Sequence, residues 1–184
     1  MKFTNIIAAF SSVAALLSGA ASVVLPGADT PLFYFVASSP SSSANLLPLR
    51  INGGTGDYAT LTGSGPIGQF YFQQGRLRAH DLSGTIPIQY YRPLLGSVLT
   101  STGCTTYGSL GFVLGSSSNK CARYDGFQIQ SNTENSQLGA KLVFNYVGGF
   151  YACGNGQDVW YKVDAADGPT ECSPIELYTV PVTA

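Results

Sequence analysis

Short apolar runs separated by glycine and proline turns make up this sequence, which contains 22 Gly and 10 Pro. No window long enough for a helix shows the apolar repeat of about 3.6 residues that an amphipathic helix needs. In the segments 69–72 and 75–80, apolar side chains instead occupy alternate positions. These positions are Phe70, Phe72, Leu77 and Ala79. Because alternation of this kind marks a half-buried antiparallel sheet, the chain is predicted to be all-β.

About ten short antiparallel strands are expected, at the spacing typical of a closed barrel or a sandwich. An aromatic strand, a glycine turn and a second strand recur at 69–80, 126–144 and 149–163, which favours a β-trefoil-like closed barrel. Another β-barrel or a β-sandwich is the alternative. Pro87 and Pro93 indicate that 85–103 forms an edge strand or a loop, because proline cannot donate to a sheet ladder.

The first residues have the features of a secretory signal peptide over 1–20. Lys2 provides the positive charge, 6–17 is apolar, and small residues precede a cleavage site after Ala20. We expect a flexible leader over 21–31 and a single all-β domain over 32–184. Since no second long apolar run follows, no membrane span is predicted.

Four cysteines lie in the second half of the chain, and in an oxidising compartment they allow three pairings. Proximity in sequence favours Cys104–Cys121 and Cys153–Cys172. A zinc site is the rival interpretation, but the chain has no CxxC pair and His80 is its one histidine. We therefore predict two disulfides and no metal.

Charged residues make up 10% of the chain, with 9 basic and 10 acidic side chains and a net charge of −1. This composition excludes a nucleic-acid-binding protein that works through a basic patch, because neutralising phosphates requires clustered Lys and Arg. The glycine stretches at 53–56 and 63–65 do not follow a strand-to-helix pattern, so they are interpreted as turns and not as phosphate cradles. We expect no cofactor.

Two groups of side chains could in principle carry acid–base chemistry. His80 next to Asp81 could act as an oriented base. Carboxylate pairs suited to a glycosidase could come from the second half of the chain. The candidates are Asp158, Asp164, Asp167, Glu171 and Glu176. Both groups are interpreted as solvated surface residues, so no catalytic residue is assigned.

Trp160, the one tryptophan, is the strongest candidate for binding a ligand. If 159–163 is a strand, Val159, Tyr161 and Val163 share one face. Asp158, Trp160, Lys162 and Asp164 then share the opposite face, which should be wet. An exposed ring there could stack against a sugar while polar neighbours bind its hydroxyls. The predicted glycan site consists of Tyr151, Asn155, Gln157, Asp158 and Trp160; alternatively, the disulfide loop covers the tryptophan.

Three stretches resemble fungal secreted cell-wall proteins of the PhiA type. They are 69–77, the segment from 126–130 through a polar turn to 141–144, and a Cys153…Trp160…Cys172 arrangement before the final strand. The resemblance implies an extracellular or wall-bound protein with no cofactor and no defined catalytic residues.

The sequence thus predicts a non-catalytic secreted protein of the fungal cell wall or surface, with a role in spore or wall development. A carbohydrate-binding, lectin-like module is the first alternative, and a small secreted hydrolase or inhibitor is the second. The expected partner is a wall polysaccharide, chitin or glucan, and the expected state is a monomer.

Overall fold

Eleven antiparallel strands and no helix form the described part of the chain. The computed structural model describes residues 22–52, 58–80, 89–130, 139–155 and 157–183. The strands are β1 (Phe33–Ser38), β2 (Phe70–Gln73), β3 (Arg76–His80), β4 (Tyr90–Thr100), β5 (Gly103–Val113), β6 (Ala122–Arg123), β7 (Phe127–Gln130), β8 (Lys141–Phe144), β9 (Gly149–Cys153), β10 (Asp158–Lys162) and β11 (Cys172–Pro181). The all-β prediction is confirmed.

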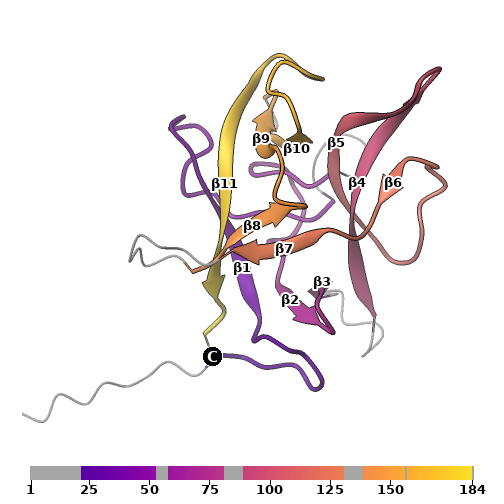
Figure 1. Cartoon of the computed structure of the whole chain (residues 1–184). Helices are drawn as coiled ribbons and strands as arrows, with labels where there is room; N and C mark the ends of the chain where they lie inside the picture. Colours follow the sequence, from indigo (N-terminus) through magenta and orange to yellow (C-terminus); the bar gives the residue numbers. More distant parts are fainter. Residues whose placement is uncertain (1–21, 53–57, 81–88, 131–138, 156, 184) are drawn as a thin grey trace, which may run out of the picture.

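The strands join edge to edge into a sheet that closes on itself (Figure 1). The ring runs through β1, β2, β3, β4, β5, β10, β9 and β11, and β11 then pairs with β1 again. The hairpin of β7 and β8 branches from β11, and β6 pairs with β4. The ring-like sheet is not a regular barrel, because these side branches leave its path.

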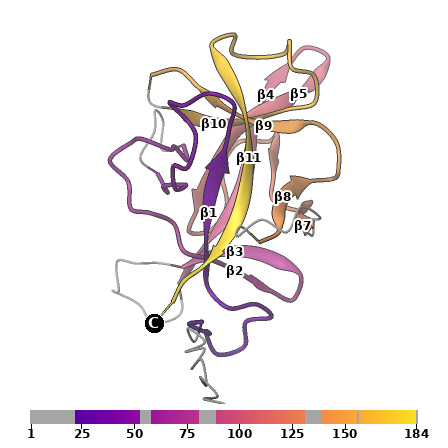
Figure 2. The same ribbon diagram turned by 90° about the vertical axis from the view of Figure 1, so that its left-hand side faces the viewer.

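The closure depends on the pairing of β1 with β11. Six residues of β1 pair in register with β11, from Phe33 opposite Pro181 to Ser38 opposite Glu176. The two strands lie side by side in both ribbon views (Figures 1 and 2). Since β1 also pairs with β2 through Phe33 and Phe70, it connects the first and last parts of the chain.

Residues 22–31, expected as a flexible leader, pack against the domain instead. The Val23 amide donates to the Val182 carbonyl at 3.2 Å, and the Leu32 amide donates to the Val23 carbonyl at 2.8 Å. Val23, Leu25 and Ala28 pack against a second small core formed by Leu32, Tyr71 and Val182. The predicted signal peptide at 1–20 lies outside the described residues.

Aromatic side chains fill the interior of the ring. Along β1 the odd positions Phe33, Phe35 and Ala37 are buried, as alternation predicts. The Phe70 ring lies 4.9 Å from Phe35 and 5.4 Å from Phe112 between centroids. Phe70 therefore joins β1, β2 and β5 across the core.

Each of the three recurring segments in the sequence forms an antiparallel hairpin. β2 pairs with β3, β7 with β8, and β9 with β10. In the first hairpin, Gln74 and Gly75 both have positive φ angles, 52° and 69°. Two such residues in succession match the twist of the flanking strands.

The expectation that 85–103 forms an edge strand or a loop is wrong for its described part, 89–103. Residues Tyr90–Thr100 form β4, a long strand that pairs with β5 along most of its length. Pro93 lies between the stretches of β4 that pair with β3 and with β6, so this edge of the strand needs no N–H donor there. Residues 85–88 lie outside the described residues.

Both predicted disulfides are confirmed. Cys104 of β5 is bonded to Cys121, which directly precedes β6. Cys153 of β9 is bonded to Cys172 of β11, and the two residues are direct partners across the strand pair. The second bond therefore fixes the loop that connects β10 with β11.

Within the ranges that the structure describes, no helix is long and apolar enough to cross a membrane.

Substituting Phe70 tests whether the aromatic core stabilises the closed sheet. Phe70→Ala should lower the free energy of unfolding by about 3–5 kcal/mol, since it leaves a cavity among three strands. Urea unfolding followed by the fluorescence of the single tryptophan measures the change. The control Leu99→Ala alters a side chain that is 60% exposed and should change stability by less than about 0.5 kcal/mol. Equal losses in the two variants would contradict this packing.

Candidate functional site

Trp160 lies on the outer face of the closed sheet, between two tyrosines. In β10, Val159 and Tyr161 point into the core, so Trp160 between them points outward and is half-buried. Its ring lies 6.0 Å from that of Tyr58 in an edge-on arrangement and 6.4 Å from that of Tyr107. Three aromatic rings thus form a continuous cluster, which we call the aromatic platform.

The segment 58–60 lies in space between β5 and β10, and it places Tyr58 in this platform. The Ala59 amide donates to the Leu110 carbonyl of β5 at 2.9 Å, and the Val159 amide of β10 donates to the Ala59 carbonyl at 2.8 Å. Tyr58 itself bridges to Gly111. These bonds fix Tyr58 beside Trp160, although the two are far apart in the sequence.

A hollow of about 340 Å³ adjoins the platform on the outer face of β4 and β5. Gly96 and Gly111 supply the floor, where side chains are absent, and Ser109 lies between β4 and Trp160 as the direct strand partner of both Gly96 and Trp160. Tyr58 belongs to the lining as well as to the platform. The hollow and the rings therefore form one continuous surface.

Polar groups at the rim of this hollow come from the loop before β6. Ser117 and Asn119 line it. The Asn119 amide group donates to the Ser97 carbonyl at 3.0 Å and accepts from the Cys121 amide at 2.8 Å, so its orientation is fixed. The Cys104–Cys121 disulfide ties this loop to β5.

Lys162 does not lie on a wet face as predicted; its side chain is only 2% exposed. The loop between β10 and β11 covers it, and Lys162 Nζ donates to the carbonyls of Pro169 and of Ala165, the latter at 3.5 Å. The same ammonium lies 5.1 Å from the centre of the Tyr151 ring. Burial lowers the pKa of Lys162, and the nearby charge of Asp167 opposes this shift. This loop is held by Cys153–Cys172, so the disulfide indirectly buries the lysine.

The middle of this loop contacts the platform but does not cover all of it. The Thr106 hydroxyl donates to Asp167 Oδ2 at 2.9 Å, and a Cβ added to Gly168 would lie 2.7 Å from the Tyr107 ring. Gly168 also has a φ of +70°, which favours glycine. The loop therefore packs against the Tyr107 ring, while Trp160 keeps part of its surface in solvent.

Of the five residues predicted for the glycan site, three share the outer face. Tyr151 is the direct strand partner of Trp160, and Asp158 begins β10 on the same side. Asn155 is exposed in the turn between β9 and β10. Gln157 donates from Nε2 to the Gly154 carbonyl at 3.2 Å, so part of its amide closes that turn. The turn residues therefore stand beside the face, not on it.

The side chains considered for acid–base chemistry have structural contacts. His80 Nδ1 lies 3.5 Å from Gln69 Oε1, while Asp81 is outside the described residues. Asp164 Oδ1 accepts from the Ala166 amide at 3.0 Å within the loop. Glu171 is exposed in the same loop.

Glu176 stands apart from that loop group, on β11. It forms an ion pair with Lys141 at 3.0 Å and accepts a hydrogen bond from the Tyr178 hydroxyl at 2.6 Å. The hydrogen bond from Tyr178 is the main cause that lowers the pKa of Glu176, with Lys141 adding to it. These contacts stabilise the ionised form, which cannot serve as a proton donor near neutral pH.

Across the ranges that the structure describes, no three His, Cys, Asp or Glu side chains gather in a way that could hold a metal ion. Comparison with known protein families, curated proteins and solved structures finds no match to this chain.

Sequence reasoning identified Trp160 but missed Tyr58 and Tyr107. Both come from elements that are distant in the chain, and a single tyrosine in a strand carries no local signal of a site. The glycines of β4 and β5 that line the hollow were the one sequence signal of this site, because glycine inside a strand often marks a close approach of another group.

Removing the Cys153–Cys172 disulfide should expose Lys162. The variant Cys153→Ser/Cys172→Ser should lose about 3 kcal/mol of stability, and its loop should open. Acetylation with an amine-reactive ester, followed by mass spectrometry, measures the exposure. In the native protein, exposed Lys120 should react readily and Lys162 slowly, whereas both should react in the variant. Rapid labelling of Lys162 in the native protein would contradict its burial.

Proposed function

We propose that this chain is a non-catalytic extracellular protein that attaches to the fungal cell wall by binding its polysaccharide, chitin or β-glucan, through the aromatic platform. The observation that carries the proposal is the partly exposed side chain of Trp160, placed between Tyr58 and Tyr107 and beside a hollow.

A ring cluster of this kind suits a sugar. One face of a pyranose in these polysaccharides presents C–H groups, which carry a slight positive charge and pack against the negative face of an aromatic ring. A concave surface with aromatic walls and a few polar groups is also the common form of a binding site. The platform and its glycine-floored hollow combine both features.

Hydrogen-bonding groups surround the platform. The phenol hydroxyls of Tyr58 and Tyr107 can donate and accept, and the Ser117 hydroxyl lines the hollow. Asp158 lies on the same outer face of β10 and can accept from sugar hydroxyls. This set provides directional contacts without requiring a charged ligand.

Two further features support a wall location. The two disulfides are consistent with an extracellular protein, because such bonds persist in oxidising surroundings. The resemblance of three stretches of the sequence to PhiA-type proteins also favours the wall, and with it a role in spore or wall development. A rigid scaffold made of strands suits adhesion, since a preformed platform loses little conformational entropy on binding.

Retention on insoluble polysaccharide tests the proposal. Native protein should sediment with chitin or with β-glucan, and Trp160→Ala should lose most of this retention. Trp160→Phe should keep a measurable part, because a smaller aromatic face remains. A ring contact in water contributes on the order of 1 kcal/mol, so the alanine variant should bind at least several-fold more weakly.

A second exposed aromatic provides the matched control. Tyr146 is 62% exposed on the turn after β8 and lies outside the platform. Tyr146→Ala should bind as the native protein does, and circular dichroism should show that all variants keep their strands. If Trp160→Ala is retained as well as Tyr146→Ala, the platform is not the binding surface.

A further inference from the structure

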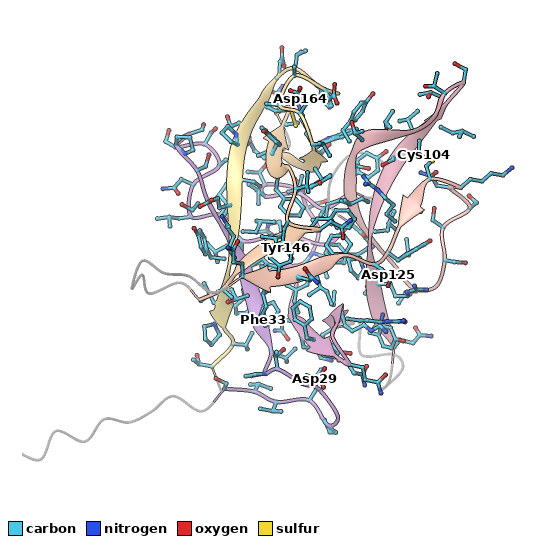
Figure 3. All side chains as sticks on the ribbon, viewed as in Figure 1. Asp29, Phe33, Cys104, Asp125, Tyr146 and Asp164 are labelled. Carbon is cyan, nitrogen blue, oxygen red and sulfur yellow. A yellow bond between two sulfur atoms is a disulfide. The ribbon has the colours of Figure 1, made fainter. Side chains whose placement is uncertain are left out.

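Three of the arginines converge on a cavity of about 270 Å³ on another part of the molecule. Arg76 and Arg78 come from β3 and Arg92 comes from β4, while residues 124–128, which follow β6 and include the start of β7, supply the rest of the wall. Figure 3 labels Asp125 in this wall and shows it well away from Asp164, in the loop beside the aromatic platform.

Two of these guanidinium groups are held in place by aromatic rings. Arg78 stacks over Tyr90 with its Cζ 4.2 Å from the ring centre, and Arg92 stacks over Tyr124 at 4.5 Å. The Tyr124 hydroxyl in turn accepts from the Ser117 amide, which fixes that ring. Stacking uses the flat face of a guanidinium and leaves its N–H edge available to an oxyanion.

The strand pairing places these two charges next to each other. Ala79 of β3 pairs with Tyr91 of β4, so Arg78 and Arg92 flank this pair on adjoining strands. Like charges so placed repel each other unless an anion lies between or beside them. The sheet therefore concentrates positive charge in a protein that has few charges in total.

Among the residues that the structure describes, no acidic side chain forms an ion pair with the arginines of this cavity. In the part of the chain that the structure describes, the one ion pair joins Lys141 and Glu176, elsewhere in the molecule. Asp125 belongs to the lining but makes no ion pair with the arginines. Arg78 is only 9% exposed, and its buried Nε has no hydrogen-bond partner. Burying a charge without a partner is costly, and a bound anion offsets that cost.

We propose that this cavity binds an oxyanion, a carboxylate or phosphate group carried by a ligand of about monosaccharide size. Arg78 and Arg92 bind its oxygens through their N–H edges, and Arg76 contributes from the rim. The cavity is separate from the aromatic platform, so this proposal does not depend on the proposed function.

Calorimetric titration of the purified protein with inorganic phosphate and with glucuronate, in low-salt chloride buffer, tests the site. The native protein should bind at least one of them with saturation. Preference for phosphate assigns a phosphate ligand, and preference for glucuronate assigns a carboxylate. Arg92→Gln and Arg76→Gln are the test variants, since Arg78 is buried and its substitution would also disturb the packing of the fold. Arg92→Gln should weaken binding about tenfold or more, the effect of losing a charge-assisted hydrogen bond.

The control Lys120→Gln removes one positive charge outside the cavity, on an exposed side chain. It should bind as the native protein does, and thermal unfolding should show that each variant is folded. Absence of saturable binding to both anions would overturn the proposal. Equal weakening by Lys120→Gln and Arg92→Gln would also overturn it, because the effect would then reflect net charge alone.

Discussion

The pairing of β1 with β11 is the constraint on which the rest of the structure depends. Six residues of each strand pair in register, and they join the first described segment to the last. This closure removes two open sheet edges, which would otherwise invite pairing with other chains. It also gives the sheet an inside, filled with aromatic rings such as Phe35 and Phe70, and an outside that is free to carry binding groups. Residues 22–31 add to it by packing along the end of β11.

Both candidate sites use the outer face that this closure creates. On one part of it, β5, β10 and the segment 58–60 place Trp160 between two tyrosines, and two glycines leave a hollow beside them. On another, β3 and β4 place arginines side by side, with aromatic rings behind them. Each disulfide fixes one loop on this face: Cys153–Cys172 holds the loop that buries Lys162, and Cys104–Cys121 holds the loop that lines the hollow.

Local patterns predicted the local structure, and contacts between distant segments decided the rest. The hairpin of β2 and β3 follows from alternating apolar residues and a short polar turn, so it was predictable. β5 was not predictable, because it is rich in glycine, which is unfavourable inside a strand. The structure shows why glycine is needed at one of these positions: a Cβ added to Gly108 would lie 2.9 Å from the Gly96 backbone of β4. The burial of Lys162 was missed because the covering loop is fixed by a disulfide and not by its own sequence. Trp160 was identified from composition, since it is the one tryptophan of the chain.

The indole N–H resonance of Trp160 offers the most direct test of the central claim, that the chain adheres to wall polysaccharide through its aromatic platform. Because the sequence has one tryptophan, the nitrogen–proton correlation spectrum has one indole signal. Titration with soluble oligomers of chitin and of β-glucan should shift that signal with saturation for at least one of them, together with amides of β5 and β10. An indole signal that stays unchanged while either oligomer binds elsewhere, or while neither binds, would contradict the account.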